Sequence, residues 1–241
     1  MKKLNQNQKN ALWFSLFAVA TIVLWNIDGG NYVLYPFTIL GTWFHEMGHG
    51  LAALILGGDF KHLEIYSNGS GLAKFAHNFG RIKLGLTAAA GPFGPTIAGA
   101  LLIISSTNLK LTKFMLGFLS AALIVSCILW VQPLFGIGFF IIIAFGILLA
   151  YISHSGSAEV KRLTLQFLGI QAFVSVYLSI DYLFSSGGFV GNTQYFSDTR
   201  VMAENLFLPY WFWGFLILAF SVVMVYYSFK IAFGQGKKPG L

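Results

Sequence analysis

Residues 33–57 of this chain read VLYPFTILGTWFHEMGHGLAALILG. The stretch is almost wholly apolar and is long enough to cross the hydrocarbon core of a bilayer, which takes roughly 17–25 residues. Its second half carries three ionisable side chains, those of His45, Glu46 and His49. Ionisable groups are costly at that depth and usually serve a function. The stretch therefore predicts a membrane helix that carries a functional site.

Residues 45–49 form the pattern His-Glu-x-x-His. On a helix, two histidines four residues apart project from one face and can reach a single metal ion. Zinc suits two imidazole nitrogens, and a catalytic zinc site keeps one position open for water. Glu46 is then placed to take a proton from that water as the general base. A polar helix contact without metal is the structural alternative.

The composition indicates a protein whose solvent is largely lipid. Hydrophobic residues make up 56% of the 241 positions and charged residues only 10%, against about 25% charged in soluble proteins. The net charge is +7, and the basic residues lie at the two ends and between apolar runs. That placement favours contact with lipid headgroups over nucleic acid. The expected partners are the lipid bilayer and no nucleic acid.

We expect an all-α polytopic membrane protein with about six to seven transmembrane helices and a short β-hairpin after the second. The hairpin is predicted from Phe60, Leu63, Ile65 and Tyr66, which precede an Asn-Gly turn. One integral membrane domain covers residues 1–241, with a metal-site core at about 33–215. The candidate spans are residues 11–27, 33–57, 83–105, 113–131, 134–151, 163–185 and 209–233.

The first span follows a basic N-terminus, as in a signal peptide, but no small-residue cleavage site follows it. We therefore interpret it as a membrane helix. The expected location is the cell membrane, meaning a plasma or inner membrane.

Several blocks of the sequence resemble one family. They are Phe44–Ala53 closing with Gly57-Gly58, Gly69-Ser70-Gly71-Leu72, Ala90-Gly91-Pro92-Phe93-Gly94, and Ser197-Asp198. Together they resemble the site-2 protease superfamily of intramembrane zinc metallopeptidases, and more narrowly its M50B-like branch. The resemblance implies a Zn²⁺ site that hydrolyses a transmembrane or membrane-proximal peptide bond of a membrane-protein substrate. It also implies a third metal ligand, an aspartate from a later membrane segment.

Two aspartates compete for the role of third ligand, because the chain lacks a Leu-Asp-Gly or Asn-Pro-Asp-Gly motif. Asp181 lies about 6 Å inside one end of the span 163–185, where a carboxylate is costly unless it is paired. Asp198 follows Ser197 in a polar segment, where it could instead cap a helix. Depth slightly favours Asp181, and the sequence leaves both open.

The pairs Gly91-Pro92 and Gly94-Pro95 interrupt the third span. A kink with satisfied backbone groups is the structural interpretation. The functional one is a broken segment beside the site, in which Gly91, Pro92 and Gly94 position an extended substrate. The predicted hairpin could also bind substrate by strand addition.

Two other functions are compatible with the pattern. A transporter or sensor that keeps the metal site would carry more ionisable residues inside the spans, arranged as a relay. A non-proteolytic scaffold would keep the fold and bind membrane partners without using Glu46. The oligomeric state is open.

Overall fold

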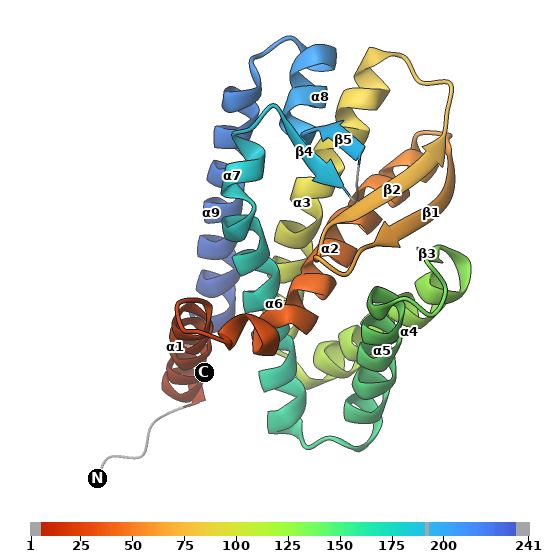
Figure 1. Ribbon diagram of the computed structural model, residues 1–241. Helices are drawn as coiled ribbons and strands as arrows, with labels where there is room; N and C mark the ends of the chain where they lie inside the picture. The colour runs from red at the N-terminus through yellow and green to blue at the C-terminus, as the bar shows by residue number, and fades with distance from the viewer. Residues whose placement is uncertain (1–5, 191–192, 235–241) are drawn as a thin grey trace.

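Long apolar helices form the body of the protein, and two small hairpins lie at one end of it (Figure 1). The computed structural model describes residues 6–190 and 193–234, so the basic residues Lys2, Lys3, Lys237 and Lys238 lie outside the described residues. The helices are α1 (Gln6–Trp25), α2 (Gly30–Ile55), α3 (Arg81–Ser105), α4 (Leu109–Leu129), α5 (Ile137–Ser155), α6 (Ala158–Leu178), α7 (Ile180–Leu183), α8 (Asp198–Leu206) and α9 (Tyr210–Gly234).

Within the described residues, four helices are long and apolar enough to cross a membrane: α3, α4, α5 and α9. A fifth span results if α1 and α2 count as one broken or re-entrant segment, because they are bent by 116°. The bend falls at Gly29, whose φ of 79° is in the left-handed region that glycine adopts readily. The chain is therefore an integral membrane protein with four to five candidate spans, and the count of six to seven is not confirmed.

The sixth predicted span, residues 163–185, is not among these candidate spans. Helix α6 begins with charged residues and carries Gln166 and Gln171 among its buried positions. Gln171 donates a hydrogen bond to the Thr21 hydroxyl of α1 at 2.7 Å. The polar side chain of Gln171 thus joins α6 to α1 by a hydrogen bond inside the protein.

The hairpin after α2 is confirmed. Strand β1 (Asp59–Ile65) pairs antiparallel with β2 (Gly71–Ala76), and Gly69 in the turn has a φ of 86°. The sheet gains a third strand, β3 (Val131–Gln132), which pairs parallel with β1 between α4 and α5. The strand order is β2-β1-β3, which leaves β2 at an edge.

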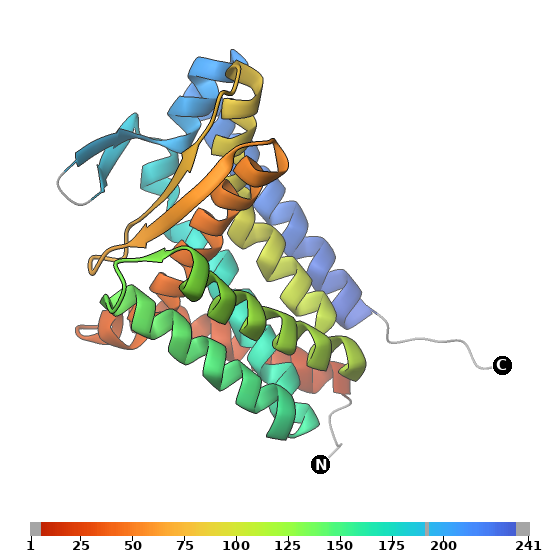
Figure 2. The ribbon, with the colours of Figure 1, turned by 90° about the vertical axis from the view of Figure 1, so that its right-hand side faces the viewer.

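A second hairpin follows α7. It consists of β4 (Gly187–Val190) and β5 (Thr193–Phe196) and leads directly into α8. Figure 2 shows that both hairpins and α8 lie at the same end of the bundle. The segments that follow α2 and α7 therefore meet at the end where α2 carries its ionisable residues.

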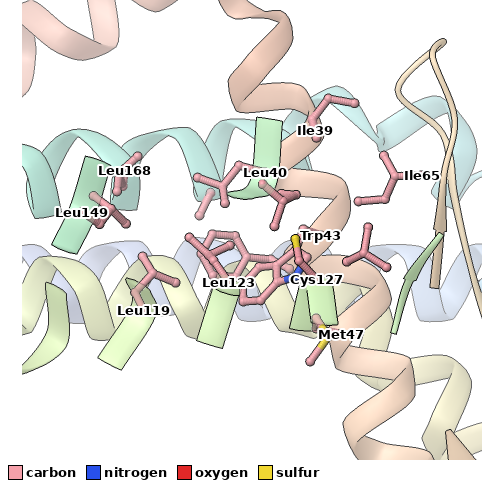
Figure 3. Close-up of a cluster of buried hydrophobic side chains, with 14 of the residues drawn as sticks. Ile39, Leu40, Trp43, Met47, Ile65, Leu119, Leu123, Cys127, Leu149 and Leu168 are labelled. Atoms are coloured by element: carbon pink, nitrogen blue, oxygen red, sulfur yellow. The ribbon is translucent and has the colours of Figure 1, made fainter. Parts of the chain in front are cut away.

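The largest buried cluster fixes α2 against the rest of the bundle. Trp43 and Met47 of α2 pack among side chains of α4, α5 and α6 (Figure 3). The indole N–H of Trp43 donates to the Ser126 hydroxyl of α4 at 2.9 Å, which satisfies a polar group in this apolar core. The side of α2 that carries Trp43 and Met47 thus packs against apolar side chains. The side that carries His45 and His49 lies outside this cluster.

Candidate metal centre

Three side chains converge between α2 and the start of α8. His45 and His49 lie four residues apart on α2, and their Nε2 atoms are 3.2 Å apart. Asp198 Oδ2 lies 2.9 Å from His45 Nε2, and Asp198 Oδ1 lies 3.2 Å from His49 Nε2. All three residues offer a ligand atom within 4.8 Å of the others, and they form the one such group found in the described residues.

The chemistry of these donors fits a metal cation. His49 Nδ1 lies 2.8 Å from the Thr87 carbonyl oxygen, which can only accept, so Nδ1 carries the proton. A neutral His49 therefore turns the bare lone pair of Nε2 toward the other two groups, as in metal-binding histidines held by a backbone carbonyl. Ligands around tetrahedral zinc stand about 3.3 Å apart, close to the 2.9–3.2 Å seen here. His45, His49 and Asp198 could hold zinc.

Asp198 is positioned by its two neighbours in the chain. Ser197 caps α8 by accepting from the Arg200 N–H, and its hydroxyl donates to the Ser185 carbonyl at 2.6 Å. The Thr199 hydroxyl donates to the Leu183 carbonyl at 2.8 Å. These contacts hold the buried carboxylate of Asp198 facing the two histidines, where it can bind a cation.

The structure separates the two competing aspartates. Asp181 lies in α7 with an exposed side chain, and it is not part of the group formed by His45, His49 and Asp198. The geometry therefore favours Asp198 over the slightly preferred Asp181, and the identity of the third ligand stays a prediction. Depth along a span misled here because α6 ends at Leu178 and α7 begins at Ile180, so Asp181 does not lie within the long helix.

Glu46 is buried beside the histidines and is held by strand β2. Its Oε2 accepts a hydrogen bond from the backbone N–H of Ala73 at 2.7 Å. Gly71 allows this approach, because a Cβ there would lie 2.7 Å from Glu46 Cγ. The Thr42 hydroxyl also donates to the Gly69 carbonyl at 2.6 Å, which fixes the turn of the hairpin on α2. The carboxylate is thus oriented but is not one of the three ligating groups.

A cavity of about 360 Å³ opens beside this group. His45 and Glu46 line it together with Tyr182 of α7, whereas His49 and Asp198 are not among its lining residues. Residues 69–71 of the first hairpin and Phe189 of the second line it as well. Binding sites for small ligands span about 300–1,000 Å³, so the cavity has room for a short peptide segment next to the histidines.

A family model described as Peptidase M50B-like matches residues 14–228. The chain belongs to this family. No curated protein and no solved structure matches it. The matched region includes His45, Glu46, His49 and Asp198.

In this M50B-like chain, the glycines and prolines of the third span act differently from the expectation of a broken segment. Helix α3 runs without interruption from Arg81 to Ser105, with Pro92 and Pro95 inside it. Gly91 packs directly against the His49 ring, and a Cβ at Gly94 would overlap the Phe44 carbonyl oxygen. These glycines bring α3 close to α2. Pro92 lines the cavity, while a role of Gly91, Pro92 or Gly94 in positioning substrate stays a prediction.

We expect Gly91→Ala to weaken metal binding by this M50B-like protein by about 10-fold or more, because the added Cβ would meet the His49 ring and must displace it. Zinc titration against a competing chelator measures the effect. Gly117→Ala in α4 is the matched control, since a Cβ there is 3.7 Å from its nearest neighbour, Ser153 Oγ. Equal zinc affinity in both variants would contradict the packing argument.

Sequence reasoning missed three partners of this M50B-like site. The Thr87 carbonyl and the Ala73 N–H are backbone groups, which no residue pattern reveals. Tyr182 lies next to the favoured Asp181, yet it is the tyrosine that lines the cavity. The flanking Ser197 and Thr199 were the available signal for Asp198, because a Ser-Asp-Thr run indicates a tightly bonded helix start.

Proposed function

We propose that the protein is an intramembrane zinc metalloprotease. The observation that carries the proposal is the convergence of His45, His49 and Asp198 on one point, with Glu46 beside them at a cavity. The family and the apolar helices support a peptidase within a membrane. Zinc held by the two imidazoles and the carboxylate would polarise the scissile carbonyl and lower the pKa of a coordinated water.

Glu46 acts as the general base. Its carboxylate accepts a proton from the attacking water while the water oxygen forms a bond to the carbonyl carbon. The carbon–nitrogen bond then breaks, and Glu46 returns the proton to the leaving amine. The hydrogen bond from Ala73 N–H engages Oε2, so Oε1 is the oxygen that takes the proton in this proposal. Burial of Glu46 keeps bulk water from competing for the proton.

The substrate is a membrane protein whose chain is extended at the scissile bond. A helical substrate would hide its carbonyls in hydrogen bonds and would have to unwind locally. Strand β2 supports an extended pose, because it lies at the edge of its sheet and also contacts Glu46. Pairing with this edge would place a substrate strand next to the general base.

The competing functions have less support. A transporter or sensor needs a relay of further ionisable groups, and the described residues contain one cluster of the metal-binding kind. A scaffold has no use for the hydrogen bond that orients Glu46. Proteolysis uses every group described in the site.

The test is cleavage by purified protein in lipid vesicles, against a panel of single-span peptides. We expect cleavage to stop after zinc removal by a chelator and to return when stoichiometric zinc is added, because His45, His49 and Asp198 then regain their ion. Mass spectrometry of the products locates the cut. Cleavage that continues at full rate in metal-free protein would contradict the proposal.

A further inference from the structure

Tyr182 is the one tyrosine that lines the cavity next to His45 and Glu46 within the described residues. It belongs to α7, and Leu183, which follows it, is hydrogen-bonded to Thr199, the neighbour of Asp198. The phenol is thus carried by an element tied to the ligand group and lines the space that a substrate would fill.

The backbone fixes Tyr182 and Asp198 relative to each other. The residue after Tyr182, Leu183, is fully buried, and its carbonyl accepts from the hydroxyl of Thr199, which follows Asp198. The hydroxyl of Ser197, which precedes Asp198, donates a hydrogen bond to the Ser185 carbonyl. The backbone that carries Tyr182 is therefore held next to the backbone that carries Asp198. That stiffness is what a preorganised donor requires.

Tyr182 lines the cavity together with His45 and Glu46, whereas Asp198 does not line it. Glu46 is held from strand β2, and Tyr182 is presented by α7. A carbonyl that approached the histidines through the cavity would thus meet a carboxylate from one element and a phenol O–H from another.

We propose that Tyr182 is a catalytic residue that donates a hydrogen bond to the carbonyl oxygen of the scissile bond as negative charge develops there. The proposal rests on the function proposed above and names a further residue for it. Tyr182 keeps its own proton throughout. A hydrogen-bond donor aimed at a developing oxyanion contributes about 100- to 1,000-fold to kcat. We expect a contribution of this size from the phenol.

The test compares wild type, Tyr182→Phe and a matched control, Tyr177→Phe, whose ring is exposed on α6. Each is purified in lipid nanodiscs with zinc. Three quantities are measured: zinc per chain, the Kd of a leucine-containing dipeptidyl phosphinate, and kcat and KM on a peptide that the wild type cleaves. The phosphinate is tetrahedral and anionic, so it resembles the transition state more than the substrate does.

For Tyr182→Phe we expect unchanged zinc content, about 30-fold or weaker phosphinate binding, and a kcat lowered about 100-fold with KM within about threefold. Tyr177→Phe should match the wild type in all three. An unchanged phosphinate Kd in Tyr182→Phe would overturn the proposal. Parallel loss of zinc would also overturn it, because Tyr182 would then act through Asp198 by holding the metal ligand.

The phosphinate separates this proposal from the protease assignment. If the wild type binds the phosphinate but cleaves no peptide, the proposed function fails, and the affinity ratio between wild type and Tyr182→Phe still decides the role of the phenol. If the wild type cleaves a peptide but does not bind the phosphinate, the protease assignment stands, and an unchanged kcat in Tyr182→Phe would overturn the role of the phenol.

Discussion

Replacing Glu46 with glutamine should abolish proteolysis while zinc stays bound. An amide cannot accept the proton of the attacking water, and a general base contributes about 100- to 10,000-fold to the rate. We expect a fall of at least about 1,000-fold in cleavage rate. The side-chain oxygen of glutamine can still accept the hydrogen bond from Ala73 N–H, so the local structure should persist. Glu46 is not among the three ligating residues, and zinc per chain should therefore be unchanged.

The measurement pairs peptide cleavage with zinc analysis on the same preparation. Glu204→Gln is a suitable control, because Glu204 lies on the surface of α8, where its ion pair with Arg200 is exposed and contributes little to stability. Full cleavage by Glu46→Gln would remove the general base from the mechanism. Loss of zinc in that variant would show that Glu46 is a ligand and that the ligand set is different.

Asp198→Asn and Asp181→Asn should differ sharply in metal affinity. Both substitutions keep the size of the side chain and remove its charge. Asp198 contacts the Nε2 atoms of both histidines at 2.9 and 3.2 Å, so its loss removes the anionic ligand. Even residues that merely support metal ligands are worth about 10- to 100-fold in affinity. We therefore expect more than about 100-fold weaker zinc binding in Asp198→Asn.

Asp181→Asn should bind zinc as the wild type does, because its side chain is exposed and lies outside the group. Competition with a chelator of known affinity gives both dissociation constants. Circular dichroism of the helices shows whether each variant is folded. A zinc site lost in Asp181→Asn and kept in Asp198→Asn would contradict the geometry, and it would return the role of third ligand to Asp181.

The first hairpin shows how far local patterns carry. Leu63 and Ile65 are buried in the alternation expected of a half-buried strand. Phe60 is buried as well, three residues before Leu63, because the register of β1 shifts between Phe60 and His62. The Asn-Gly turn also lies where predicted, with Gly69 at positive φ. Strand β3 could not be predicted in this way, because a two-residue strand has no pattern of its own and exists only through its pairing with Leu63 and Glu64.

Helix α3 shows the opposite case. Gly91-Pro92 and Gly94-Pro95 are sequence signals for a break, and the helix nevertheless continues through them. Close packing explains the glycines, since the Gly91 and Gly94 backbone lies against the His49 ring and the Phe44 carbonyl. A residue pattern cannot tell a kink from a close approach, because the difference lies in the helix on the other side.

Composition and hydropathy are enough to predict a membrane protein, and helix periodicity is enough to place His45 and His49 on one face of α2 with Glu46 beside them. Both properties depend on the chain alone and on no contact with a distant segment. Only the packing of the helices shows that Asp198, 153 residues beyond His45, joins the two histidines and that Asp181 does not. That choice depends on how α7 and α8 pack against α2 and α3, which no local pattern encodes.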